Sequence, residues 1–468
     1  MRRLSVDELL ERAASVANLA MLRTYAEPSP IQIAAINEYT SLLESKLRSL
    51  SPDDNPTRDR ILTQLDIHRS ILAPIRRLPK ELLIEIFFLL AYESPLRTLY
   101  VAAAVASVCT VWRTLVRGLT SLWTKVVVKT MSDFDGYCEL FLPLTKEKLS
   151  DLRCDNRRIL RLLWDDIEPY ASRWRSVTLE GRLSMLPDLK VIYMENLERL
   201  VVDAYDAPMS AELSALDFVV APNLRHIGLT IDALQSARQL HVPVTRALTS
   251  LVIEAMSPFP VTHTLPLLQA CAGTLQSLTL KVRYPLEGSE GSYPTSTSHT
   301  FVMEALTFIS LIDPACALLN HISAPLVRQL ILGNVPAYGT RSLQGFLTRS
   351  QASRCLHTLR VYSVEDRDMY SWIPCFQLMD NLRALHFDDL LSNREFLEIL
   401  VRRADRPVLL PSLEALAIYR VDKEHAELQE IIDDMCASRA KAKQYSGGRT
   451  GYGLLGWIKE DENGISVI

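Results

Sequence analysis

Two patterns in this 468-residue chain have the spacing of chemical motifs: a glycine-rich turn and three of its pairs of adjacent acids. The segment Gly451–Gly456 reads GYGLLG, the glycine spacing of turns that hold a dinucleotide pyrophosphate. Such a turn lies between a buried strand and a helix whose N-terminus faces the phosphates. Here a polar, basic segment precedes the turn, and only 12 residues follow Gly456. We therefore predict a flexible tail at 446–468 and no nucleotide site.

The paired acids lack the arrangement that general acid–base chemistry needs. They stand at 165–166, 388–389 and 433–434. Adjacent residues on a strand point to opposite faces, so the two carboxylates of such a pair cannot act on one substrate. No G-x-S-x-G nucleophile motif and no G-x-x-x-x-G-K-[ST] phosphate loop occurs. The chain is predicted not to be an enzyme and to have no catalytic residues.

Cysteine and histidine are too dispersed to form a metal centre. The eight cysteines include no C-x-x-C pair, and the nine histidines include no H-E-x-x-H motif. Most cysteines lie in apolar runs, where a free thiol behaves as a small hydrophobic residue. We expect no metal, no cofactor and no disulfide framework, in keeping with a cytoplasmic or nuclear protein.

Charge and hydropathy exclude two further classes of partner. The formal net charge is −4, with 51 basic and 55 acidic residues, so no electrostatic footprint for phosphate binding is visible. No run of 18 apolar residues occurs, so no membrane span is predicted. Asp7, Glu8 and Glu11 interrupt the apolar residues near the N-terminus, which argues against a secretory signal. The chain is predicted to bind neither nucleic acid nor membranes.

The first part of the chain has helical periodicity. A weak amphipathic helix is predicted within 1–27 and an antiparallel helical hairpin within 28–74, where Ser29 and Pro30 suit a helix start. Apolar residues recur at seven-residue spacing along the first hairpin helix, at Ile36, Leu43 and Leu50. The heptads are too few for a free coiled coil. Packing against the next domain is therefore preferred over a dimerisation or docking arm.

Residues 75–125 carry more apolar surface than a unit of this size can bury. Pro79 suits the first position of a helix. Apolar residues then cover far more than one face of that helix, at Leu82, Leu83, Ile86, Phe87, Leu89 and Leu90. Because so small a unit cannot cover two faces of one helix from within, part of this surface is predicted to be an interface for a partner.

The order of these residues resembles an F-box. The motif is carried by Leu78-Pro79-x-Glu81-Leu82-Leu83-x-x-Ile86-Phe87, then Val108-Cys109-x-x-Trp112-Arg113-x-Leu115, then Leu122-Trp123. The preceding helical arm is similar to that of a large group of fungal F-box proteins. The resemblance implies docking on the Skp-family adaptor and, through it, on the cullin of a ubiquitin ligase. The residues implied in adaptor binding are Leu78, Pro79, Leu82, Ile86, Phe87, Val108, Trp112, Leu115 and Trp123.

From residue 174 onward a short pattern recurs, in which apolar residues stand first, fourth and sixth. It begins at ten positions: Trp174, Leu197, Leu224, Leu248, Leu275, Met303, Val327, Leu356, Leu382 and Leu413. The mean spacing of about 27 residues lies in the range of leucine-rich repeats. One unit cannot bury its own apolar side chains, so such units stack their strands side by side. An α/β layer fold with the same alternation of strands and helices is the alternative.

The asparagine or cysteine expected after the last apolar position of such repeats is missing in all ten, so an irregular array without a regular asparagine ladder is expected. The predicted fold class is α+β. An N-terminal all-α part, the helical arm plus the three-helix F-box unit, is followed by a linking region at 126–173. An irregular α/β leucine-rich-repeat-like solenoid then covers 174–445.

These predictions lead to a hypothesis in which the chain supplies proximity rather than bond chemistry. It would be the substrate receptor of an SCF-type cullin–RING ubiquitin ligase, with an unknown target protein held on the repeat domain. The alternative is a repeat-based scaffold that does not deliver its partner to ubiquitin. Strand residues that alternate with the buried ones would face the target; the candidates are Lys281, Arg360, Tyr362, His386, Asp388 and Tyr419.

Overall fold

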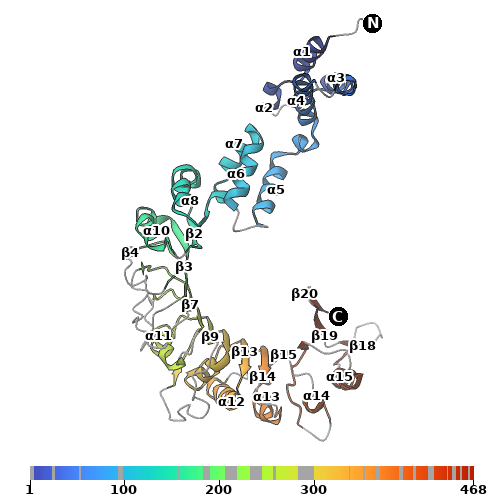
Figure 1. Cartoon of the computed structure of the whole chain (residues 1–468). Helices are drawn as coiled ribbons and strands as arrows, with labels where there is room; N and C mark the ends of the chain where they lie inside the picture. The colour runs from blue at the N-terminus through green and yellow to red at the C-terminus, as the bar shows by residue number, and fades with distance from the viewer. Residues whose placement is uncertain are drawn as a thin grey trace. The chain divides into compact units, whose positions relative to one another are not determined.

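The computed structural model divides into two compact units. Unit 1 is Met1–Val128 with Ser132–Leu152, and unit 2 is Lys129–Met131 with Arg153–Ile468. The residues that the structure describes are 5–23, 27–51, 54–92, 98–156, 158–182, 190–205, 219–231, 245–256, 260–282, 300–336, 338–351, 354–364, 369–388, 394–403, 407–419, 426–439, 441–444, 450–453, 456–461 and 464–467. Unit 1 is mainly helical and unit 2 is built on a sheet (Figure 1).

Unit 1 opens with four helices that pack on one another. They are α1 (Val6–Val16), α2 (Leu19–Arg23), α3 (Pro30–Ser49) and α4 (Asn55–Leu72). The Ser29 hydroxyl accepts a hydrogen bond from the backbone N–H of Gln32, so Pro30 begins α3 as the Ser-Pro pair predicts. α1 packs against both α3 and α4, and the heptad residues Ile36 and Leu43 are buried among these helices.

Buried polar side chains on α4 tie these helices together. The imidazole of His68 lies 3.1 Å from the Thr40 hydroxyl through Nδ1 and 3.3 Å from the Ala13 carbonyl through Nε2. Gln64 donates from its side-chain amide to the Ala17 carbonyl at 2.7 Å. Burial lowers the pKa of His68, so its ring is neutral at pH 7. Each of these groups has its hydrogen-bond partner, which is the condition for polar groups inside a helix bundle.

The second part of unit 1 is a smaller helical group. The 3-10 helix η1 (Pro74–Arg77) leads into α5 (Lys80–Tyr92), α6 (Thr98–Val108), α7 (Thr110–Gly118) and the 3-10 helix η3 (Thr120–Trp123). The strand β1 (Lys125–Val128), the helix α8 (Met131–Gly136), the π-helical turn η4 (Tyr137–Phe141), the helix α9 (Leu142–Thr145) and the strand β2 (Ser150–Cys154) follow. β1 and β2 are neighbours in a sheet.

Unit 2 contains ten parallel strands whose order in the sheet is their order in the chain. They are β3 (Trp174–Arg182), β5 (Arg199–Tyr205), β7 (His226–Ile231), β8 (Ser250–Ala255), β9 (Ser277–Val282), β11 (Phe308–Ile312), β13 (Gln329–Val335), β14 (Thr358–Val364), β15 (Ala384–Asp388) and β16 (Ala415–Tyr419). Two shorter parallel pairs lie beside them: β4 (Ile192–Tyr193) with β6 (Val219–Val220), and β10 (Phe301–Val302) with β12 (Ile322–Ser323).

Helical segments precede, connect and follow these strands. They are α10 (Leu160–Ile167), η5 (Glu168–Arg173), η7 (Val261–Thr264), α11 (Leu265–Ala270), η8 (Asp313–Asn320), α12 (Gly339–Ser350), η10 (Met369–Trp372), α13 (Ile373–Phe376), α14 (Arg394–Leu400) and α15 (Ala426–Arg439). The helices α11, α12 and α13 lie on one side of the strands (Figure 1). Arg439, at the end of α15, is buried and donates to the carbonyls of Leu400, Leu409 and Leu410.

A row of branched apolar side chains runs across the ten strands in register. Its members are Val177, Leu200, Ile227, Leu251, Leu278, Ile309, Leu330, Leu359, Leu385 and Leu416, and none is more than 2% exposed. Each strand therefore adds one side chain to a continuous core that no single strand could bury alone. Alternate residues point the other way and form the opposite, more exposed sheet face.

The register moves one predicted repeat start. Phe308 pairs with Ser277 on one side and with Gln329 on the other, so the residue equivalent to Leu275 is Leu306 and not Met303. Met303 instead accepts the hydrogen bond of the turn before the strand, from the N–H of Leu306 at 3.4 Å. The spacing of the repeats along the sequence does not locate this position. Insertions lengthen the loops between strands and do not change the register of the sheet.

Asparagine side chains bridge neighbouring turns before the strands, and not after the last apolar position, where leucine-rich repeats have their asparagine. The amide of Asn196 donates to the Ser172 carbonyl at 2.9 Å, and that of Asn223 to the Glu195 carbonyl at 2.8 Å. Asn381 makes the equivalent bond to Arg354 at 3.4 Å. Each asparagine stands directly before the first apolar residue of its unit. These bonds satisfy turn carbonyls across the stack.

The C-terminal segment differs from the predicted flexible tail. β17 (Lys441–Gln444) pairs antiparallel with β18 (Thr450–Gly453), β19 (Gly456–Asp461) pairs parallel with β16, and β20 (Gly464–Val467) pairs antiparallel with β19. The glycines of GYGLLG therefore fall in strands. The turn from a strand into a helix that a dinucleotide site needs does not occur there.

Candidate functional site

The helix α5 has a buried apolar stripe that forms the core of its group. Leu83, Phe87 and Ala91 stand at i, i+4 and i+8 and are at most 5% exposed. The Phe87 ring lies 5.0 Å from that of Trp112 on α7, at an angle of 60°. Half-buried side chains close the edges of this core, among them Leu78, Ile86 and Leu115. α5, α6 and α7 are thus held together by aromatic and branched side chains.

Trp123 fixes the end of α7 to this core. Its indole N–H donates to the Val116 carbonyl at 2.9 Å, and its ring stacks on Phe141 with a centroid distance of 5.1 Å. The side chain is only 1% exposed. The last carbonyls of a helix have no N–H partner within the helix, and the indole N–H supplies one to the Val116 carbonyl in the last turn of α7. Trp123 therefore acts as a structural anchor of the group.

A second apolar stripe on α5 faces outward. Leu82, Ile86 and Leu89 stand at i, i+4 and i+7; Leu82 is 46% and Leu89 59% exposed, and Ile86 is half-buried. This set, the α5 outer stripe, is centred roughly 130° around the helix from the buried stripe, at about 100° per residue. A helix that is apolar on two faces but covered on one leaves a surface that fits a protein partner.

These two stripes, and the turn at Trp123, lie in a stretch with a recognised sequence family. Residues 75–129 match the F-box-like family. The match covers the second helical group of unit 1, from η1 to the strand β1. No curated protein matches the chain as a whole.

The structure divides the nine residues expected to bind the adaptor into two sets. Within the F-box-like domain, Pro79 and Leu82 are exposed, Val108 is 61% exposed, and Leu78, Ile86, Trp112 and Leu115 are half-buried. Phe87 and Trp123 are each 1% exposed and lie in the core, because their rings fill the space between α5, α7 and η4. The expectation that these two side chains contact an adaptor directly does not fit their burial.

Two exposed leucines were missing from the expected set. Leu89 belongs to the α5 outer stripe, and Leu90 beside it is also exposed. Their signal was present in the sequence, since Leu82, Ile86 and Leu89 have the i, i+4, i+7 spacing of one helix face. The excess of apolar residues on α5 hid this spacing, because it gave every face of the helix some leucine or isoleucine.

The strand positions of the candidate target-binding residues alternate with those of the buried row. Arg360 pairs with His386 in register, and Tyr362 pairs with Asp388, which pairs with Tyr419. These five positions gather on β14, β15 and β16. Lys281 stands apart on β9, where its amine lies 3.8 Å from the Glu254 carboxylate.

His386 is less available than predicted. Its side chain is 6% exposed, so its imidazole is not open to a large partner. Burial, and then the neighbouring Arg360 charge, lower the pKa of His386 to about 4. Burial and Arg199 likewise lower the pKa of His226 to about 4, and His226 lies with Nδ1 2.9 Å from the Ser250 hydroxyl. Both imidazoles are neutral at pH 7.

We expect acid to destabilise unit 2 through these two histidines. Their pKa is about 4 when folded, against an ordinary value of 6.5, so between these values the unfolded chain binds more protons. The free energy of unfolding therefore falls as the pH drops from about 7 to about 4. Because the chain has two units, hydrogen exchange of the β7 and β15 amides, corrected for the pH dependence of intrinsic exchange, measures the slope across this range. His226→Gln with His386→Gln should flatten it, and an unchanged slope in the double variant would contradict this cause.

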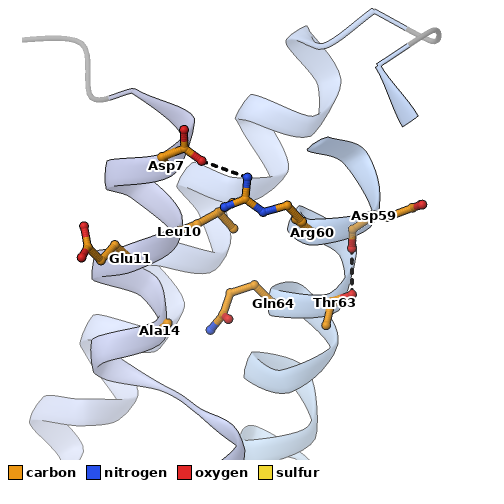
Figure 2. A pocket seen from close by; sticks show the side chains of 8 residues that line it. All are labelled: Asp7, Leu10, Glu11, Ala14, Asp59, Arg60, Thr63 and Gln64. Atoms are coloured by element: carbon orange, nitrogen blue, oxygen red, sulfur yellow. Dashed lines mark hydrogen bonds and ion pairs between the residues drawn. The ribbon is translucent and has the colours of Figure 1, made fainter. Parts of the chain in front are cut away.

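The structure also describes a groove on the N-terminal helices, between α1 and α4 (Figure 2). It measures about 600 Å³ and is lined by Asp7, Leu10, Glu11, Ala14, Asp59, Arg60, Thr63 and Gln64. The Arg60 guanidinium pairs with the Asp7 carboxylate at 2.9 Å, and both side chains are largely exposed. A solvent-exposed ion pair of this kind contributes little to the free energy of folding, and it activates no nucleophile.

Three buried cysteines of unit 2 are unreactive thiols. Burial raises the pKa of Cys271 to about 11 and those of Cys316 and Cys375 to about 12, so these thiols are not nucleophilic at pH 7. Among the described residues, no group of three or more His, Cys, Asp or Glu side chains could hold a metal ion. No described helix is long and apolar enough to cross a membrane.

Proposed function

We propose that this chain is the substrate receptor of an SCF-type cullin–RING ubiquitin ligase. F-box domains bind Skp-family adaptors, and the F-box-like match at 75–129 gives this chain such a module. The observation that carries the proposal is the α5 outer stripe, in which Leu82 and Leu89 are exposed on either side of Ile86, which packs on the edge of the core. A partner that covers this stripe removes leucine side chains from water, which favours association.

The adaptor would contact Leu82, Ile86 and Leu89, with Pro79 and Leu78 at the start of α5. Leu89 is added to the set on its exposure, while Phe87 and Trp123 support the surface from the core. Protein interfaces concentrate their binding energy in a few buried apolar anchors, of about 2 kcal/mol or more each. The proposal therefore needs only part of the exposed set to act as anchors.

Unit 2 would hold the target protein. We propose that it is an irregular leucine-rich-repeat-like array; its ten parallel strands in chain order, its continuous apolar row and its asparagine bridges support this. The sheet face that carries Arg360 and Tyr362 is the surface offered to the target. The chain would then raise the local concentration of target lysines at the ligase, without performing a bond-forming step itself.

Affinity purification of the full tagged chain, co-expressed with a Skp-family adaptor and a cullin, tests the proposal. We expect both proteins to co-purify, because the chain would bind the adaptor and the adaptor would bind the cullin. Adaptor without cullin would favour the alternative, a repeat-based scaffold that does not deliver its partner to ubiquitin. Absence of the adaptor would overturn the docking assignment.

A further inference from the structure

One part of the unit 2 sheet carries uncompensated positive charge. Three basic residues stand directly before β13, β14 and β15: Arg328, His357 and Arg383. Backbone hydrogen bonds join them, since the N–H of His357 donates to the Arg328 carbonyl and the N–H of Arg383 donates to the His357 carbonyl, both at 2.9 Å. They are therefore stacked on three consecutive strands. Arg360 lies on the middle strand, on the exposed sheet face. These four residues form the basic sheet patch.

The guanidinium groups of this patch are free to meet a partner. Arg328 and Arg383 are exposed and Arg360 is half-exposed. Across the ranges that the structure describes, five ion pairs involve other residues, and none involves Arg328, Arg360 or Arg383. The patch ends at Glu414, the next residue of the same stack, and at Thr307 on the other side.

The equivalent residues at the start of β3 and directly before β5 and β7 alternate between basic and acidic, so their charges offset one another. Arg175, Glu198 and Arg225 are stacked by bonds of 2.8 Å and alternate in sign. The carboxyl ends of these strands are acidic, with Glu180 paired to Asp203 in register. Along the described part of this stack, basic residues follow one another without an acid between them at Arg328, His357 and Arg383, although the chain as a whole has a net charge of −4. A surface this short does not fit the long, evenly charged backbone of a nucleic acid.

We propose that the basic sheet patch binds an acidic segment of the target protein, rich in Asp and Glu. Arginine forms its strongest hydrogen bonds with carboxylates, often through two N–H groups at once. Neighbouring strands lie about 4.8 Å apart, so Arg328 and Arg383 are separated by roughly 10 Å. A peptide in the polyproline II conformation rises about 3.1 Å per residue with three residues per turn, so acids three positions apart lie on one side of it and roughly 9 Å apart, close to this separation. Ile331, half-buried beside Arg360, offers contact to an apolar side chain between them.

The inference rests on the proposed function, because it names the kind of target that the receptor would hold. Its test is fluorescence anisotropy of the full chain with a labelled peptide of Glu-x-x-Glu repeats, alongside the same peptide with Gln for Glu. We expect binding of the Glu peptide alone, weakened when salt rises from about 50 mM to about 300 mM. Arg328→Ala with Arg383→Ala should weaken it by about tenfold or more.

Arg225→Ala is the matched control, since Arg225 is exposed at the same position of its strand but stands between Glu198 and Thr249, with no basic residue next to it in the stack. It should change the peptide affinity by less than about twofold. Equal binding by the double variant, or equal binding of the Gln peptide, overturns the inference. A single-stranded oligonucleotide of the same charge that binds more tightly than the peptide overturns it in favour of nucleic acid. Adaptor co-purification, measured on the same samples, tests the proposed function separately, because neither arginine lies in the F-box-like domain.

Discussion

Leu82→Glu with Leu89→Glu is expected to abolish co-purification of the Skp-family adaptor while the chain stays folded. Both side chains are about half exposed, so the folded state loses little buried apolar area on substitution. An adaptor that covers the α5 outer stripe would have to bury two carboxylates against apolar groups without partners for them. The adaptor affinity should fall by at least about a hundredfold, since each of two anchors contributes about 2 kcal/mol or more. Pull-down with purified adaptor measures the loss.

The matched control is Leu42→Glu with Leu62→Glu. These leucines are also exposed on helices of unit 1, but they lie on α3 and α4, outside the F-box-like match. They should leave adaptor binding unchanged, and thermal unfolding should be the same for both double variants within a few degrees. Normal adaptor binding by the Leu82/Leu89 variant would show that another surface is used.

This pair tests docking more directly than changes at the start of α5. The carbonyl of Pro79 accepts the N–H groups of Leu82 at 3.1 Å and Leu83 at 3.2 Å, and Leu78 packs on the core. Substituting Leu78 and Pro79 therefore alters the helix start and the core as well as the exposed surface. A loss of binding in such a variant would have two causes. The α5 outer stripe separates them.

Sequence reasoning located the F-box-like segment but could not assign its faces. Residue order and spacing were sufficient to place the motif, because each element of it is local. Whether Phe87 or Ile86 points inward depends on where α7 crosses α5, and that crossing is a tertiary contact between distant residues. The burial of Trp123 also depends on a tertiary contact, because its ring stacks on Phe141 of η4. Local spacing carries no information on such contacts.

In unit 2 the strands were predictable and their connections were not. The apolar residues that alternate along each strand face one core, so their period survives in the sequence. Met303 is apolar and close to the expected spacing, so the sequence favours it as a repeat start, but the sheet register selects Leu306. The asparagine bridges do not follow from the repeat pattern, because that pattern expects an asparagine after the strand, whereas Asn196, Asn223 and Asn381 precede it. His386 alternates correctly along β15, and only packing shows it to be buried.

Trp123→Ala should destabilise the F-box-like domain by about 3–5 kcal/mol, because it removes a large buried ring and leaves a cavity. The Val116 carbonyl also loses the indole N–H that it accepts at 2.9 Å. Hydrogen exchange of the α7 amides is the suitable measurement, since the chain has two units and a single unfolding midpoint would mix them.

Trp123→Phe reduces the cavity cost of the Ala variant, because it keeps an aromatic ring against Phe141 and loses the N–H with the second ring of the indole. We expect it to cost about 1–3 kcal/mol. Both variants should lose adaptor binding only in proportion to the fraction of the domain that is unfolded, unlike the Leu82/Leu89 variant, which stays folded and does not bind. If Trp123→Ala instead kept wild-type exchange rates and still lost the adaptor, Trp123 would be a direct contact. Its burial at 1% exposure argues for the anchoring role, because an adaptor cannot reach the ring without opening the core.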